Sequence, residues 1–259
     1  TPHTPIPLRL EGSEMCIRDS KSSNAFNTIM SEELTSLIED LSMSSDNIRS
    51  IILTGSGEKA FCAGGDLKER NGMSDDDWKK QHLVYERMIR ALIRCPIPII
   101  GAINGAAFGG GCEIAAALDF VYVSENAKFA LPELGLGIIP GAGGTQTLSR
   151  AVGERRAKEL ILTGRVFTAQ EAVKWNLAND IFPVDKLLDE TIKIAELISS
   201  KAPIAVKQAK QSIHKGLQMS LSDGLSFEIE AYNRTIPTKD RIEGVLAFNE
   251  KRKPKFKGK

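Results

Sequence analysis

Apolar residues return every three or four positions along much of the chain, which is the spacing of amphipathic helices. One such stripe predicts a helix that Ser31 caps and that ends near Met43. Its apolar positions are Leu34, Leu37, Ile38 and Leu41. A second stripe predicts a helix that Pro96 and Pro98 terminate. Its positions, most of which are expected to be core, are Trp78, His82, Tyr85, Ile89 and Leu92.

Short apolar runs rich in β-branched residues alternate with these helices. Residues 48–54, 97–103 and 120–123 are expected to form strands. Further helical patterns cover residues 113–118, 157–162, 169–175 and 185–199. Strands that alternate with helices, followed by a helix-rich last third, predict an α/β body with a helical C-terminal region.

Composition excludes several classes of protein. The chain has 259 residues, 42% of them hydrophobic and 26% charged, which suits one large globular domain. A net charge of +1 gives no attraction to nucleic acid or to anionic membranes, and the sequence has no apolar run long enough to span a bilayer. The four cysteines form neither a CxxC pair nor a disulfide framework, so a reducing compartment is expected. The three histidines lie far in sequence from the glycine-rich segments and give no support to a zinc site or a Ser-His-Asp triad.

A run of three glycines, Gly109 to Gly111, follows one predicted strand and precedes a predicted helix. Glycine lets the backbone approach a ligand closely, and the free N–H groups at a helix start favour negative charge. A tight turn is the alternative, and the run alone supports both interpretations about equally. No Gly-Lys-Ser/Thr follows and the spacing differs from Gly-x-Gly-x-x-Gly, so no nucleotide-phosphate loop is indicated.

Two glutamates stand close to this run. Glu113 lies at the expected helix start, and Glu133 follows twenty residues later, directly after Pro132. A single glutamate is by default a surface residue, but both of these lie among apolar residues. Two carboxylates that face one water can divide acid and base work between them. Cys62 and Cys112 have no partner base in the sequence and are expected to be small buried residues.

Five segments together resemble the crotonase (enoyl-CoA hydratase) superfamily. They are residues 24–27 (Asn-Ala-Phe-Asn), 61–68 (Phe-Cys-Ala-Gly-Gly-Asp-Leu-Lys), 105–113, 131–146 and 248–258. The resemblance runs from about residue 22 to residue 259, and Thr147 departs from it where the family often has arginine. Residues 235–244 are similar to the methylglutaconyl-CoA hydratase branch.

The resemblance implies an α/β fold, a crotonase-type spiral of ββα turns with a helical C-terminal trimerisation region. It places the spiral core at residues 22–195 and the helical region at residues 196–259. Three prolines in the first seven residues argue against regular structure there, and the family's initial strand is not recognisable. Residues 1–21 are therefore expected to be foreign or disordered, with the first core strand missing. A native variant terminus is the alternative.

The same resemblance implies roles for particular residues. Glu113 acts mainly on the attacking water, and Glu133 acts mainly as the proton donor. The backbone N–H groups of Gly65 and Gly110 form an oxyanion hole, and part of the stripe at 78–92 lines the acyl pocket. The residues expected to bind the substrate are Ala25, Ala63, Gly64, Asp66, Leu67, Lys68, Gly109, Pro132 and Gly141.

These implications predict an enoyl-CoA hydratase, a hydro-lyase that adds water to a trans-2-enoyl-CoA and gives a 3-hydroxyacyl-CoA. Retention of both glutamates favours hydration over the other crotonase reactions, which are enoyl-CoA isomerisation and acyl-CoA hydrolysis. Hydration of methylglutaconyl-CoA is a further alternative. An inactive RNA-binding member is the non-enzymatic alternative, which the absence of lysine from residues 34–45 disfavours.

The expected partners are the acyl-CoA substrate and further copies of the chain, as a homotrimer or a dimer of trimers. No nucleic acid, membrane or metal is expected. Coenzyme A is part of the substrate, so no separate cofactor is expected either. The expected location is the cytoplasm or, in a eukaryote, the mitochondrial matrix.

Overall fold

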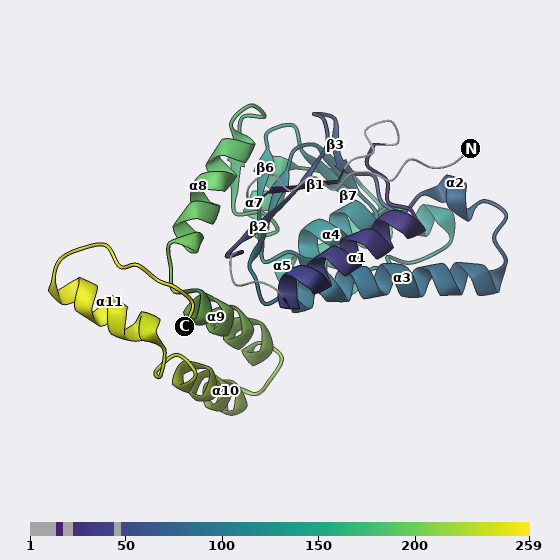
Figure 1. Ribbon diagram of the computed structural model, residues 1–259. Helices are drawn as coiled ribbons and strands as arrows, with labels where there is room; N and C mark the ends of the chain where they lie inside the picture. The colour runs from purple at the N-terminus through teal and green to yellow at the C-terminus, as the bar shows by residue number, and fades with distance from the viewer. Residues whose placement is uncertain (1–13, 18–22, 44–47) are drawn as a thin grey trace.

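The computed structural model describes residues 14–17, 23–43 and 48–259 and has two sheets surrounded by helices (Figure 1). The first sheet is parallel throughout and has the strand order β1 (Glu14–Ile17), β2 (Ile51–Gly55), β4 (Ile99–Ile103), β6 (Phe120–Ser124), β9 (Asp180–Phe182). The second has the order β3 (Ala60–Cys62), β5 (Ala106–Phe108), β7 (Lys128–Ala130), β8 (Phe167–Thr168). In the second sheet only the β7–β8 pair is antiparallel.

Consecutive strands alternate between the two sheets. Strands β2, β4 and β6 belong to the first sheet, and the strands that directly follow them, β3, β5 and β7, belong to the second. Each turn of chain therefore adds one strand to each sheet. This arrangement confirms the predicted α/β spiral.

The central strands β2 and β4 of the first sheet are buried on both faces, as is usual for parallel sheets. All five residues of β2 and all five of β4 are buried. Near-continuous apolar runs such as these made the strands at 48–54, 97–103 and 120–123 recognisable. The structure confirms all three strands and moves their ends by up to three residues.

Helices α1 (Thr28–Met43) and α3 (Asp75–Arg94) pack against each other beside the sheets (Figure 1). Their apolar stripes are buried as predicted, except that Leu37, Trp78 and His82 are half-buried. The start of α1 differs from the prediction, because the side chain of Asn27 accepts the Met30 N–H (2.9 Å). Ser31 lies inside the first turn, where its hydroxyl donates to the Asn27 carbonyl (2.8 Å).

Strand β1 corrects one expectation. It pairs in parallel with β2, with Glu14 opposite Ile52 and Ile17 opposite Gly55, so the first core strand is not missing. The proline argument failed here because the prolines all precede residue 8. Residues 1–13 and 18–21 lie outside the described residues, and a foreign origin of this segment stays a prediction.

The remaining helices complete the turns of the spiral and form the C-terminal region. They are α2 (Leu67–Arg70), α4 (Gly110–Ala117), the 3₁₀ helix η2 (Glu133–Leu136), α5 (Gly144–Val152), α6 (Glu154–Thr163), α7 (Ala169–Lys174), α8 (Leu187–Ser199), α9 (Pro203–Gly216), α10 (Leu221–Asn233) and α11 (Lys239–Asn249). Helix α8 packs on the first sheet, and α9 to α11 extend away from the body (Figure 1). The division expected at residue 195 thus falls inside α8. None of the described helices is long and apolar enough to cross a membrane.

Candidate active site

Glu113 lies in the first turn of α4 and is only 3% exposed. Its Oε1 accepts hydrogen bonds from the backbone N–H groups of Ala142 (2.8 Å) and Gly144 (2.7 Å). Burial raises the pKa of Glu113 to about 7, because the charged form loses its hydration. The two N–H donors oppose that rise, and the nearby charge of Glu133 adds to it. Near neutral pH this carboxyl group is poised between its acid and base forms.

Glu133 is the first residue of η2 and is 8% exposed. Its Oε2 is buried and has no hydrogen-bond partner among the residues that the structure describes. Burial raises the pKa of Glu133. The side chain lies against Gly109, where an added Cβ atom would stand 3.0 Å from Oε1. Because Gly109 caps α4, this contact places the second carboxylate beside the helix that carries the first.

Gly65 and Gly110 contribute two backbone N–H groups from neighbouring stretches of chain. Gly65 forms an isolated bridge with Phe26, in which the bonds run from Phe26 N to Gly64 O and from Asp66 N to Phe26 O (both 2.9 Å). That pattern does not use the Gly65 N–H. Gly110 is the first residue of α4, so its N–H has no acceptor within the helix. A Cβ atom on Gly64 would stand 3.0 Å from Gly110 N, so the residue directly before Gly65 lies beside Gly110.

These groups open into one pocket of about 980 Å³. It brings together ten of the residues predicted for the site, namely Ala63, Gly64, Gly65, Leu67, Gly109, Gly110, Glu113, Pro132, Glu133 and Gly141. Ala25, Asp66 and Lys68 do not line it. The Asp66 carboxylate instead accepts the Lys68 N–H (2.8 Å) and caps α2. A part of these three residues in substrate binding stays a prediction.

Helix α3 forms an apolar wall of the pocket. Trp78, His82, Tyr85 and Ile89 line it, whereas Leu92 lies in the core. The sequence stripe was therefore partly pocket and partly core. The His82 ring rests on Gly141, where an added Cβ atom would stand 2.3 Å from its Cε1.

Arg70 is a pocket residue that sequence reasoning missed. Its guanidinium carbon lies 4.3 Å from the Trp78 ring centroid and 5.0 Å from the Tyr85 ring centroid. Its Nε donates to the side chain of Gln81 (2.8 Å), and its charge helps to lower the pKa of Glu113. In the sequence, Arg70 belongs to a charged run, Lys68 to Arg70, that has the appearance of solvated surface. The one available signal was its spacing, one helical turn after the glycine-rich turn.

The cysteines beside the glycine segments are not nucleophiles. Cys62 and Cys112 are completely buried, which confirms the expectation. Burial raises the pKa of the Cys62 thiol to about 12 and that of the Cys112 thiol still further. Both therefore remain protonated at neutral pH.

A spiral that carries paired buried carboxylates, beside two backbone N–H groups with no acceptor among the described residues, has the features that the crotonase resemblance implied. The family model described as enoyl-CoA hydratase/isomerase matches residues 13–259. The chain belongs to the enoyl-CoA hydratase/isomerase family.

Individual relatives agree with this assignment. The short-chain-enoyl-CoA hydratase of Clostridium acetobutylicum is 41% identical, over 96% of this chain and 95% of its own length. YngF of Bacillus subtilis is 47% identical, over 92% of this chain and 91% of its own length. The crystal structure of an enoyl-CoA hydratase from Bacillus anthracis has 45% identity and a TM-score of 0.93, and 95% of each chain is covered.

Proposed function

We propose that the protein is an enoyl-CoA hydratase that adds water across the double bond of a trans-2-enoyl-CoA. The observation that carries this proposal is the pairing of two buried carboxyl groups, both with raised pKa, in one pocket with two backbone N–H groups that have no acceptor in the described part of the chain. Relatives named as enoyl-CoA hydratases support it, at 41% identity or more over most of the chain.

In the proposed reaction the thioester oxygen binds between the N–H groups of Gly65 and Gly110. These donors stabilise the negative charge that develops as the double bond is attacked. Oε1 of Glu113 is already engaged by two N–H groups, which leaves Oε2 to accept a proton from the attacking water. The water oxygen bonds to C3, and the resulting enolate takes the proton of Glu133 at C2. Exchange with solvent then restores both carboxyl groups.

The test is the loss of enoyl-thioester absorbance when the purified protein meets crotonyl-CoA. Rapid loss with the wild type, together with a loss of turnover in Glu133→Gln, supports hydration. Formation of 3-hydroxybutyryl-CoA separates hydration from thioester hydrolysis, which would release the free thiol of CoA. Folded protein that turns over no enoyl thioester overturns the proposal.

Arg70 favours a second candidate, hydration of an enoyl thioester whose acyl chain carries a carboxylate, as in methylglutaconyl-CoA. Its guanidinium lines the pocket, and it forms no ion pair with an acidic side chain of the described residues. Arginine binds carboxylates through a planar pair of N–H groups. Arg70→Met is expected to lower kcat/KM at least tenfold for a carboxylated enoyl-CoA and little for crotonyl-CoA. Equal losses for both substrates contradict this candidate.

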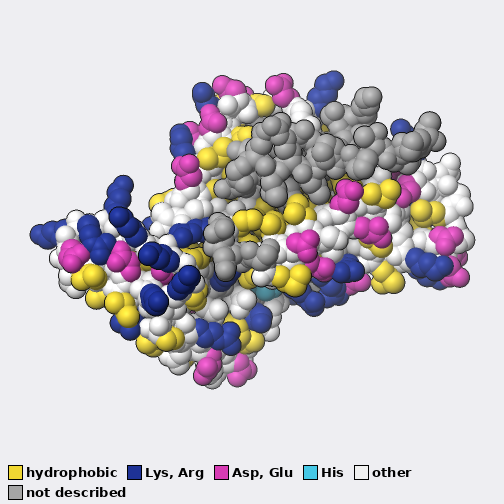
Figure 2. Space-filling view, in the orientation of Figure 1, with side chains coloured by type: hydrophobic (Ala, Val, Ile, Leu, Met, Phe, Trp, Pro, Cys, Tyr) yellow, Lys and Arg dark blue, Asp and Glu magenta, His cyan; other side chains and the backbone are white. Residues whose placement is uncertain are grey.

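Oligomerisation is proposed through the C-terminal helices. Large apolar side chains stand exposed on α9, α10 and α11, including Ile213, Leu221, Leu225, Ile229, Val245 and Phe248. Figure 2 shows hydrophobic side chains spread over this end of the molecule. Patches of this extent are unusual on a monomer, and a closed ring of identical chains would cover them on every copy. A homotrimer or a dimer of trimers is therefore the proposed assembly.

A further inference from the structure

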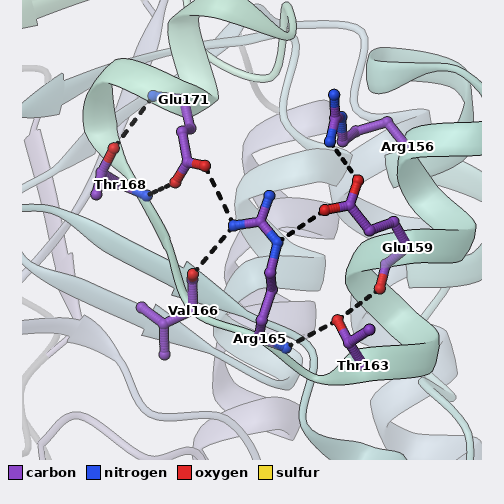
Figure 3. A network of polar contacts seen from close by, with 7 residues as sticks. All are labelled: Arg156, Glu159, Thr163, Arg165, Val166, Thr168 and Glu171. Atoms are coloured by element: carbon purple, nitrogen blue, oxygen red, sulfur yellow. Dashed lines mark hydrogen bonds and ion pairs between the residues drawn. The ribbon is translucent and has the colours of Figure 1, made fainter.

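Arg165 joins the two helices α6 and α7. Its Nε pairs with Glu159 of α6 (3.0 Å), and its Nη1 pairs with Glu171 of α7 (3.1 Å), as Figure 3 shows. Arg156 of α6 pairs with the other oxygen of Glu159. The two guanidinium groups also lie near the Trp175 ring, at 4.2 Å for Arg156 and 5.2 Å for Arg165. The network thus ties both helices to residues 164–167, the short segment that contains Arg165.

That segment runs beside the backbone that leads to Glu133. Gly164 has φ +62°, and an added Cβ atom on it would stand 3.4 Å from the Cα of Pro132. Three residues further on, Phe167 of β8 pairs with Phe129 of β7, and their rings stack at 5.3 Å. The segment therefore pairs with β7 at Phe129 and passes close to the residue directly before Glu133.

The Glu133 side chain depends on this support more than Glu113 does. Glu113 is held by two backbone hydrogen bonds, whereas Oε2 of Glu133 accepts none from the part of the chain that the structure describes. The place of the Glu133 carboxyl group thus follows from the place of its backbone.

We propose that Arg165 is a positioning residue that fixes Glu133 through Gly164 and Pro132. This inference rests on the proposed function, in which Glu133 gives its proton to the substrate. Arg165 itself touches neither the pocket nor the reacting atoms. A proton donor displaced by a fraction of an ångström loses rate without any change in substrate affinity.

The experiment compares Arg165→Ala with Arg156→Ala. Arg156→Ala is the control. It removes a cation that, like Arg165, pairs with Glu159 and lies near Trp175, but it leaves residues 164–167 unchanged. Arg165→Ala is expected to lower kcat on crotonyl-CoA about tenfold with unchanged KM, and Arg165→Lys is expected to recover part of that loss. Arg156→Ala is expected to keep the wild-type kcat. Circular dichroism confirms that each variant is folded at the assay temperature.

A second measurement does not depend on turnover. In protein labelled with ¹³C at the glutamate carboxyl carbons, Arg165→Ala is expected to shift the titration of Glu133 and to leave that of Glu113 unchanged. Equal kcat losses in Arg165→Ala and Arg156→Ala, or an unchanged Glu133 titration, overturn the inference. Absence of turnover in the wild type overturns the proposed function instead, and the titration still decides the role of Arg165.

Discussion

The ring of Phe26 lies against Gly110, so that a Cβ atom at position 110 would stand 2.5 Å from its Cζ atom. Phe26 has little room to yield, because it packs edge-on against Tyr85 at 4.8 Å and forms the backbone bridge with Gly65. The space that a side chain at position 110 would need is thus already filled by the Phe26 ring.

Gly110→Ala is expected to displace this N–H and to lower kcat by about 10²-fold, the effect of losing one oxyanion donor. Gly135→Ala is the matched control, because no atom lies within 4 Å of the added Cβ. Turnover of crotonyl-CoA by the two variants is the measurement. Near wild-type turnover in Gly110→Ala would show that this N–H does not bind the thioester oxygen.

Replacement of either carboxyl group that is proposed to act as acid or base is expected to lower turnover strongly. Glu113→Gln and Glu133→Gln should each lose at least about 10²-fold in kcat, the lower end for acid–base groups. Glu86→Gln is the control, because Glu86 also lines the pocket but is engaged by Arg90. Full activity in both catalytic variants would remove the two-carboxylate mechanism.

The raised pKa of Glu113 makes a prediction about stability. The folded protein holds this proton up to about pH 7, whereas an unfolded carboxyl group releases it near pH 4.5. The free energy of unfolding therefore falls as pH rises between these values, by up to about 3 kcal/mol from this group. Glu113→Gln should lack this part of the decline, so its stability relative to wild type should increase from pH 5 to pH 8. Urea unfolding of both proteins at pH 5 and pH 8 measures this difference in the free energy of unfolding. An equal change with pH in wild type and Glu113→Gln would contradict the prediction.

The pH dependence of activity should follow the protonation of the same carboxyl group, Glu113. Below about pH 7, Glu113 gains a proton and can no longer accept one from water. The kcat/KM for hydration is therefore expected to fall about tenfold for each pH unit below that value. A flat profile between pH 5 and pH 7 would assign the base to another group.

The C-terminal helices give a prediction about assembly. Leu217 and Leu221 are 80% and 81% exposed, and their replacement by lysine together should lower the mass of the assembly measured by light scattering. Leu162→Lys on α6 is the control, because Leu162 is also exposed but lies in the body of the fold. A wild-type protein that remains a stable monomer at micromolar concentration would refute the proposed trimer.

Most of the fold could be predicted from helix periodicity and from short apolar runs. The pair of glutamates at the centre of the site could be predicted from the glycines that flank them. The sequence did not reveal β1, because the prolines that precede it concealed a strand of only four residues. It also did not reveal that Ala142 and Gly144 hold Glu113, since a backbone donor has no side-chain signature. Arg70 was hidden for a different reason, because its environment is created by the aromatic residues of α3.

The described residues that line the pocket all lie between Phe26 and Thr147. The exposed apolar helices α9 to α11 begin more than fifty residues later. The pocket and the surface proposed for contacts between copies are thus encoded by separate stretches of the gene. Recombination that exchanged the last third of the chain between relatives would replace the surface proposed for assembly, while the two glutamates and the backbone N–H groups of the pocket were inherited unchanged.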